Sequence, residues 1–138
     1  FYCENIPQVL AECRRVLKDE GRFLCSTYGK QHMWEITDLV QKFHKEIVLS
    51  AEVLYERFGL ENGENLLAPY FPEIQMRRYE DAIEIAEAEP LISYILSCHG
   101  NQNQLLLNQY KEFREFVSAR VADGFHITKD AGIFLCRK

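Results

Sequence analysis

Residues 14–29, RRVLKDEGRFLCSTYG, constrain the fold more than any other stretch of this chain. They predict the end of a helix, a break at Gly21 that uses the freedom of glycine to adopt positive φ, and a short apolar strand over residues 22–27. Open α/β sheets place their ligands beyond the carboxyl ends of strands, so the polar turn after this strand is the expected site region. We therefore expect an α/β fold with this strand as its central support.

Periodicity and turn residues predict the other elements. Asn5 caps a helix with Pro7 in its first turn, and an apolar stripe continues that helix to residue 17. A second helix is expected to open at His32. The further predictions are helices over 32–47, 87–98 and 104–122, a helical, lid-like insertion at about 50–71, a strand over 74–79 that continues past a kink, and a terminal hairpin of 125–129 and 133–137 around Asp130-Ala131-Gly132.

Length and composition fit one globular domain over residues 1–138, with 47% hydrophobic and 27% charged residues. The formal charge of −5 argues against a nucleic-acid or anionic-membrane partner, because phosphate contacts need clustered Lys and Arg. No apolar run approaches the ~20 residues that span a bilayer, and no secretory signal opens the chain. Five cysteines without CxxC spacing predict neither a zinc site nor a disulfide framework. We expect a cytoplasmic protein without a metal.

Several short strings resemble class I S-adenosylmethionine-dependent methyltransferases. RVLKDEGRF is similar to the RVLKPGGRF signature of that family, and STYGKQHM, FGLENG, the strand ending in RRYED, LISYILS and ITKDAGIFLCRK resemble a bacterial small-molecule branch of it. The order and spacing of these strings cover nearly the whole chain. The resemblance implies the C-terminal portion of a Rossmann-like fold, with a mixed sheet, a terminal antiparallel hairpin and covering helices. In that family the last strand lies antiparallel between the two strands that precede it.

Some features of the family are absent or altered here. The Gly-rich loop and the ribose-binding acidic residue belong to an N-terminal half, and Gly59, Gly63 and Gly100 form no GxGxxG string. Asp19-Glu20 replaces the usual Pro-Gly, and Cys3 stands where the family often has histidine. We therefore expect half of an enzyme whose upstream sequence is missing. By itself this chain is expected to bind S-adenosylmethionine poorly and to be inactive.

The resemblance implies transfer of a methyl group to an unidentified small-molecule acceptor, a reaction that needs alignment and desolvation more than a covalent catalyst. No catalytic residue is predicted. By position, the residues of the substrate-side wall would be Tyr28, His32, Met33 and Trp34, and those of the cofactor-side wall Phe1, Tyr2 and Cys3. Each also has a structural interpretation, since Met33 suits a core, Trp34 a helix surface and His32 a helix start.

Two other functions stay open. The chain could be a non-catalytic interaction domain that keeps the methyltransferase C-terminal fold, or an unrelated α/β regulatory domain. The sequence upstream of Phe1 would discriminate between an enzyme and a binding domain. In the family the strand at residues 22–27 has a parallel neighbour on its far side, so here we expect an exposed edge. The expected protein partner is a second copy of this chain or the missing N-terminal half, with contact through that edge or the first helix.

Overall fold

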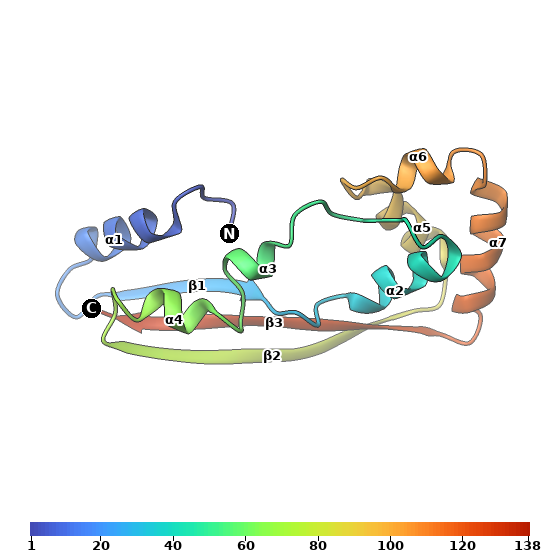
Figure 1. Cartoon of the computed structure of the whole chain (residues 1–138). Coiled ribbons are helices and arrows are strands. Elements are labelled where there is room, and N and C mark those ends of the chain that lie inside the picture. The colour runs from blue at the N-terminus through green and yellow to red at the C-terminus, as the bar shows by residue number, and fades with distance from the viewer. The chain divides into compact units, whose positions relative to one another are not determined.

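The computed structural model describes all 138 residues, which divide into two compact units. The first unit comprises residues 1–32, 53–80 and 130–138, and the second comprises residues 33–52 and 81–129. Figure 1 labels the elements, which are α1 (Ile6–Val16), β1 (Arg22–Tyr28), α2 (Trp34–Phe43), α3 (Leu54–Arg57), α4 (Gly63–Leu67), β2 (Glu73–Ile85), α5 (Ala88–Ser97), α6 (Gln102–Leu106), α7 (Tyr110–Val121) and β3 (Phe125–Arg137). None of these helices has the length and apolar character needed to cross a bilayer.

The three strands form one antiparallel sheet in the order β1-β3-β2. In register, Arg22 of β1 lies opposite Arg137 of β3, and Tyr28 lies opposite Ala131. The expected α/β class is confirmed, whereas the expected mixed sheet is wrong, because β3 separates β1 from β2 and no two adjacent strands are parallel. The last strand of the chain therefore lies between the two that precede it in sequence.

The predicted terminal hairpin is also wrong, because β3 is a single strand through Asp130-Ala131-Gly132. The side chain of Asp130 is buried in the first unit and accepts a hydrogen bond from the backbone N–H of Gln31. A Cβ atom on Gly132 would lie 2.8 Å from the carbonyl oxygen of Arg77. Glycine here permits close approach of two strand backbones, which is a recognised role for glycine inside a sheet. The Asp and Gly that suggest a turn thus serve contacts inside the sheet.

Helix α1 follows its predicted course. The Asn5 side chain accepts a hydrogen bond from the N–H of Gln8 at 3.0 Å, and Pro7 lies in the first turn. The residue with positive φ after this helix is Glu20, not the predicted Gly21. Gly21 is needed for space, since a Cβ atom there would lie 2.6 Å from the carbonyl oxygen of Lys18.

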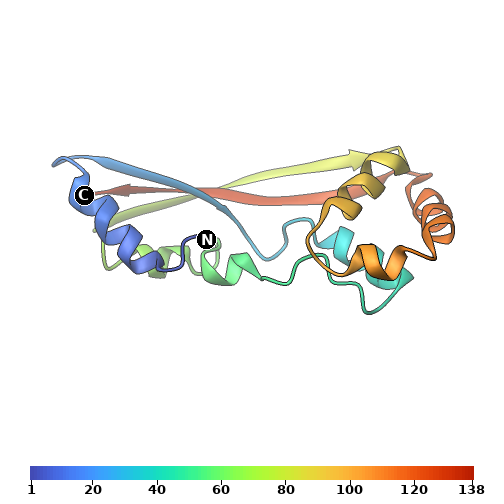
Figure 2. The same cartoon turned by 90° about the horizontal axis from the view of Figure 1, so that it is seen from above.

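In the first unit, helices α1, α3 and α4 all lie on one face of the sheet, and Figure 2 shows no helix of this unit on the other face. Phe134 and Cys136 of β3 point into the covered side, where Phe71 and Phe23 stack with ring centroids 5.3 Å apart. The core of this unit consists of Leu10, Phe58, Leu60, Leu67, Phe71, Phe134 and Cys136.

The second unit has a helical core of its own, to which β3 contributes Ile127. The predicted helix over 104–122 is interrupted between α6 and α7. The backbone N–H of Gln109 donates to the carbonyl of Leu106 in a tight turn. In a continuous helix this N–H would donate to the carbonyl of Leu105, which here accepts from the side-chain amide of Gln109 instead. The helix predicted over 32–47 is shorter, because Met33 adopts φ 57° and His44 is extended. His32 therefore lies in a turn and does not open α2.

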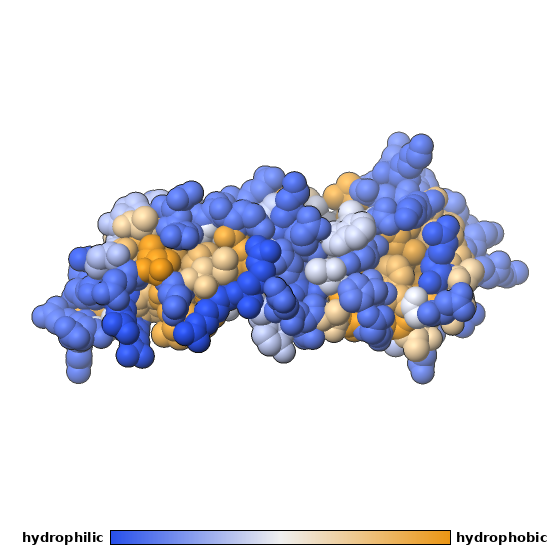
Figure 3. All heavy atoms as spheres, turned by 90° about the horizontal axis from the view of Figure 1, so that it is seen from below, coloured by the Kyte–Doolittle hydropathy of each residue, from blue (hydrophilic) through white to orange (hydrophobic).

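On the face displayed in Figure 3, orange hydrophobic atoms lie in separate patches that blue hydrophilic side chains interrupt. On the sheet of the first unit, Leu24 retains 54% of its accessible surface and Tyr79 retains 65%. Both side chains belong to the unit whose sheet has helices on only one face.

Candidate functional site

The candidate site is the loop that follows β1 in the first unit, residues 29–32. Its conformation is imposed by long-range hydrogen bonds to backbone N–H groups. Glu61 accepts from the N–H of Lys30 at 3.1 Å, and the Asp130 carboxylate accepts from the N–H of Gln31 at 3.1 Å. A Cβ atom on Gly29 would lie 2.7 Å from Glu61 Oε1, so only glycine lets the two carboxylates approach the loop. The loop is thus held on two sides.

Arg78 of β2 supplies the positive charge for these carboxylates. Its guanidinium lies 3.4 Å from Asp130 Oδ1 and 3.6 Å from Glu61 Oε1. The Asp130 side chain is only 4% exposed, so its charge depends on this pairing and on the Gln31 N–H. Sequence analysis missed this cluster, since its members come from four separate segments. The one signal in the sequence was Asp130, an acidic residue within the otherwise apolar pattern of β3.

The preceding end of β1 is fixed to the segment that carries α3 and α4. The Thr27 hydroxyl donates to the carbonyl of Phe58 at 2.6 Å, and the N–H of Leu60 donates to the carbonyl of Tyr28 at 3.3 Å. The predicted insertion at 50–71 does contain two short helices. Its later part belongs to the first unit and borders the candidate site.

Three predicted site residues meet around Tyr28. The rings of Phe1 and Tyr28 lie edge to face with centroids 5.3 Å apart, and those of Tyr28 and His32 are 5.0 Å apart. Tyr2 packs against Phe1 at 4.8 Å but is 80% exposed. Aromatic pairs at these separations are attractive. Together Phe1, Tyr28 and His32 form the aromatic wall of the candidate site.

Phe1 and Cys3 also line an apolar groove of about 140 Å³ between α1 and β1. The Arg57 guanidinium donates to the carbonyl of Cys3 at 2.7 Å, which anchors the N-terminal segment. Cys25 lies in the same groove, and burial raises the pKa of its thiol to about 12. At neutral pH this sulfur is a protonated thiol, unsuited to act as a nucleophile.

Met33 and Trp34 belong to the second unit. The N–H of Met33 donates to the carbonyl of Thr128 at 2.9 Å, and its sulfur lies 3.8 Å from the Tyr94 hydroxyl. Trp34 opens α2 and is 48% exposed. Met33 therefore makes these contacts within the second unit, and Trp34 lies on the surface of that unit.

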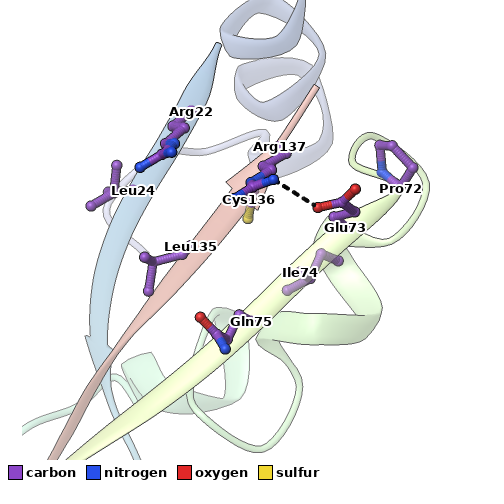
Figure 4. Close-up of a pocket in the computed structure, with 9 residues that line it drawn as sticks. All are labelled: Arg22, Leu24, Pro72, Glu73, Ile74, Gln75, Leu135, Cys136 and Arg137. Carbon is purple, nitrogen blue, oxygen red and sulfur yellow. Dashed lines mark ion pairs between the residues drawn. The ribbon is translucent and has the colours of Figure 1, made fainter. Parts of the chain in front are cut away.

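A second groove in the first unit lies elsewhere. A groove of about 440 Å³ crosses the uncovered face near the amino end of β1, and Figure 4 shows Leu24 on β1, Leu135 on β3 and Gln75 on β2 pointing toward its open side. Its charged groups are Arg22, Arg137 and Glu73, of which the last two form an ion pair. The groove holds no titratable nucleophile paired with a base. We place the candidate site at the carboxyl end of β1 because polar and aromatic groups converge there.

Comparison with known proteins finds no family model that matches this chain and no curated protein with significant similarity to it.

Proposed function

We propose that this chain is part of an S-adenosylmethionine-dependent methyltransferase that transfers a methyl group to a small-molecule acceptor. The observation that supports the proposal most is the strand order β1-β3-β2, in which the last strand is antiparallel to β1 and lies between the other two. This is the arrangement that the resemblance predicts for the end of the family's sheet.

The aromatic wall of Phe1, Tyr28 and His32 suits this chemistry. Aromatic faces attract cations, and the methyl donor in this reaction is a positively charged sulfonium. The fixed backbone of residues 29–32 would hold an acceptor in one orientation, and orientation supplies much of the rate of a direct transfer. The contribution of this chain is therefore positioning, with Tyr28 and His32 on the acceptor side.

The residues of this chain do not by themselves fit the whole cofactor. The groove lined by Phe1 and Cys3 encloses about 140 Å³, whereas pockets for ligands of that size enclose roughly 300–1,000 Å³. No Gly-rich turn between a strand and a helix is present to approach the ligand closely. The proposal therefore assigns most cofactor contacts to a protein segment outside residues 1–138.

Titration calorimetry with S-adenosylmethionine tests this proposal on two proteins. Residues 1–138 alone should give no saturable heat, and a gene product that carries a Gly-rich segment upstream of Phe1 should bind. Micromolar binding by residues 1–138 would contradict the assignment of the cofactor contacts. A natural gene product that begins just before Phe1 and binds no S-adenosylmethionine would contradict the methyltransferase itself.

A second candidate is a non-catalytic interaction domain with the same fold. It is favoured by β1, which forms one edge of the sheet and carries an exposed Leu24. The same calorimetric experiment discriminates between the two functions, since an interaction domain would bind no methyl donor in any form.

A further inference from the structure

The outer edge of β2 has no partner along the whole strand. β2 lies at one end of the order β1-β3-β2 and therefore pairs only with β3. None of the backbone hydrogen bonds outside the sheet involves residues 73–85. The strand that the methyltransferase resemblance places upstream would lie beside β1, at the opposite end of the sheet. β2 is therefore an edge strand with or without that segment, and its outward N–H and C=O groups are free to pair.

Charged residues determine which strand can pair with this edge. Charges on an edge strand prevent unspecific association, and the centre of β2 has the sequence Arg77-Arg78-Tyr79-Glu80-Asp81. In the reverse direction the same five residues present an acid wherever the forward direction presents a base, with the tyrosine at the centre. An antiparallel copy of β2 therefore carries the charges complementary to those of β2. This self-complementarity favours a second copy of the chain as the partner of the edge.

We propose that two copies of this chain pair through the outer edges of β2, antiparallel and about a two-fold axis at Tyr79. In that register Arg77 of each copy lies opposite Asp81 of the other, and Arg78 lies opposite Glu80. Like charges directly opposite each other are unfavourable, and this register places none opposite each other along β2. A shift of the axis by one residue in either direction would place Arg78 opposite Arg78 or Glu80 opposite Glu80.

The side chains that would meet near the axis are accessible in the single chain. Tyr79 is 65% exposed, so two copies of its ring would bury apolar surface against each other. Arg77 and Asp81 are exposed, and the Arg77 guanidinium donates to Gln75 of the same strand at 3.2 Å. Arg78 already pairs with two carboxylates of its own chain. The electrostatic part of the contact therefore depends on Arg77 and Asp81.

The strand contact is small, so the dimer is weak and depends on protein concentration. Stable interfaces bury about 800 Å² on each partner, more than one strand edge supplies. A two-fold contact of this kind is closed, so association stops at the dimer. Sedimentation velocity on residues 1–138 from about 1 μM to 1 mM should show the sedimentation coefficient rising from the monomer to the dimer value. A single monomer species over that range overturns the proposal.

Charge reversal at Arg77 and Asp81 tests the register. Within one copy these residues are four apart, roughly 13 Å along the strand, so they do not pair with each other. Arg77→Glu and Asp81→Arg each place like charges across the axis, and each should weaken the dimer about tenfold. Repulsion by net charge alone predicts that Asp81→Arg tightens the dimer, because the chain carries a charge of −5. Both residues are exposed, so the circular dichroism spectra of the variants should match that of the parent chain.

A mixture of the two single variants is the decisive measurement. In a dimer with one copy of each, the substituted residue 77 lies opposite the substituted residue 81, and the two unsubstituted residues lie opposite each other. Both contacts then join opposite charges, so a one-to-one mixture should associate about as tightly as the parent chain. The double variant Arg77→Glu/Asp81→Arg should do the same by itself. A dimer insensitive to the single variants, or a mixture as weak as its components, would overturn the proposal.

Amide hydrogen exchange locates the contact in the parent chain without any substitution. The amides on the outer side of residues 77–81 should exchange more slowly at high protein concentration than at low concentration, because only pairing across the edge of β2 gives them an acceptor. The exchange of amides on the outer side of β1 should not depend on concentration. Concentration-dependent protection of β1 without protection of β2 would show association through another edge and would overturn the proposal.

Discussion

The carboxylate of Asp130 accepts a hydrogen bond at 3.1 Å from the backbone N–H of Gln31, a residue 99 positions earlier in the chain. This contact joins the last strand to the loop after the first strand. Because the Asp130 side chain is buried and also pairs with Arg78, one carboxylate fixes the backbone on which the candidate site is built.

Asp130→Ala should destabilise the first unit by about 2–3 kcal/mol, because it leaves the Gln31 N–H and the Arg78 guanidinium without their buried acceptor. Asp130→Asn is the control, since it keeps an oxygen for Gln31 and loses only the charge. Urea unfolding followed by circular dichroism gives the free energies. Equal stability of the alanine variant and the parent chain would show that water replaces the carboxylate at no cost.

Gly132→Ala should destabilise the sheet by about 1–3 kcal/mol, since the added Cβ would lie 2.8 Å from the Arg77 carbonyl oxygen and β3 must move away from β2. Gly124→Ala is a comparison in which the added Cβ meets no neighbouring atom. Because Gly124 has φ 93°, this substitution should lower the stability only through backbone strain, by about 1 kcal/mol. Thermal unfolding of both variants measures the difference, and a Gly132→Ala protein as stable as its parent would contradict the close strand contact.

Comparison of α1 and β1 with the residues around Asp130 and Gly132 shows what the sequence could and could not predict. Local signals predicted α1 from Asn5 and Pro7 and β1 from its apolar run, since caps and periodicity act within a few residues. The Asp-Ala-Gly string has the composition of a turn, and only contacts with Gln31 and Arg77 make it part of a strand. The end of α6 could not be predicted for a similar reason. The apolar stripe alone predicts one continuous helix, whereas the hydrogen bonds of Gln109 to Leu105 and Leu106 end α6.

The candidate site was predicted in outline only. Tyr28 and His32 were predicted because they lie at and just beyond the carboxyl end of β1. In the structure the ring of Tyr28 contacts those of His32 and Phe1. Met33 follows His32 directly in sequence but makes its contacts in the second unit, because its positive φ turns the backbone into α2. No local pattern reveals a single residue with such a φ when it is not glycine.

The proposed methyltransferase function predicts that Tyr28→Ala and His32→Ala each lower the turnover of methyl transfer about tenfold, as expected for the loss of one aromatic contact to a bound cation or acceptor. The fold should remain, because the loop backbone is held by Glu61 and Asp130. Tyr79→Ala is a suitable control, as that ring is 65% exposed on β2. After a screen for acceptors with labelled S-adenosylmethionine, steady-state kinetics supply the measurement, and unchanged kinetics in both site variants would leave Tyr28 and His32 with a packing role.

Glu35 should make the second unit more stable at neutral pH than in acid. Partial burial opposes its ionisation, but hydrogen bonds from the Thr128 hydroxyl and N–H outweigh burial and lower the pKa of the Glu35 carboxyl. A lowered pKa in the folded state stabilises the protein above the unfolded pKa of about 4.3, and that stabilisation is lost as the pH falls through the folded pKa. Glu35→Gln should therefore flatten the acid limb of a plot of stability against pH. Thr128→Val should do the same, and an acid limb unchanged in both variants would mean that other carboxyl groups determine it.

Thiol labelling should distinguish Cys25 from Cys3. Burial raises the pKa of Cys25 to about 12, so at pH 8 only about one molecule in ten thousand carries the thiolate that reacts with iodoacetamide. Cys3 is exposed and should be labelled first. Between pH 7 and pH 10 the labelling rate at Cys25 should rise about tenfold per pH unit, because the thiolate fraction does so below the pKa. Mass spectrometry of the peptides reads both sites in one sample, and labelling in urea, where burial is lost, should bring the two rates together. Equal rates in the folded chain would show that the groove beside α1 opens to solvent faster than the reagent reacts.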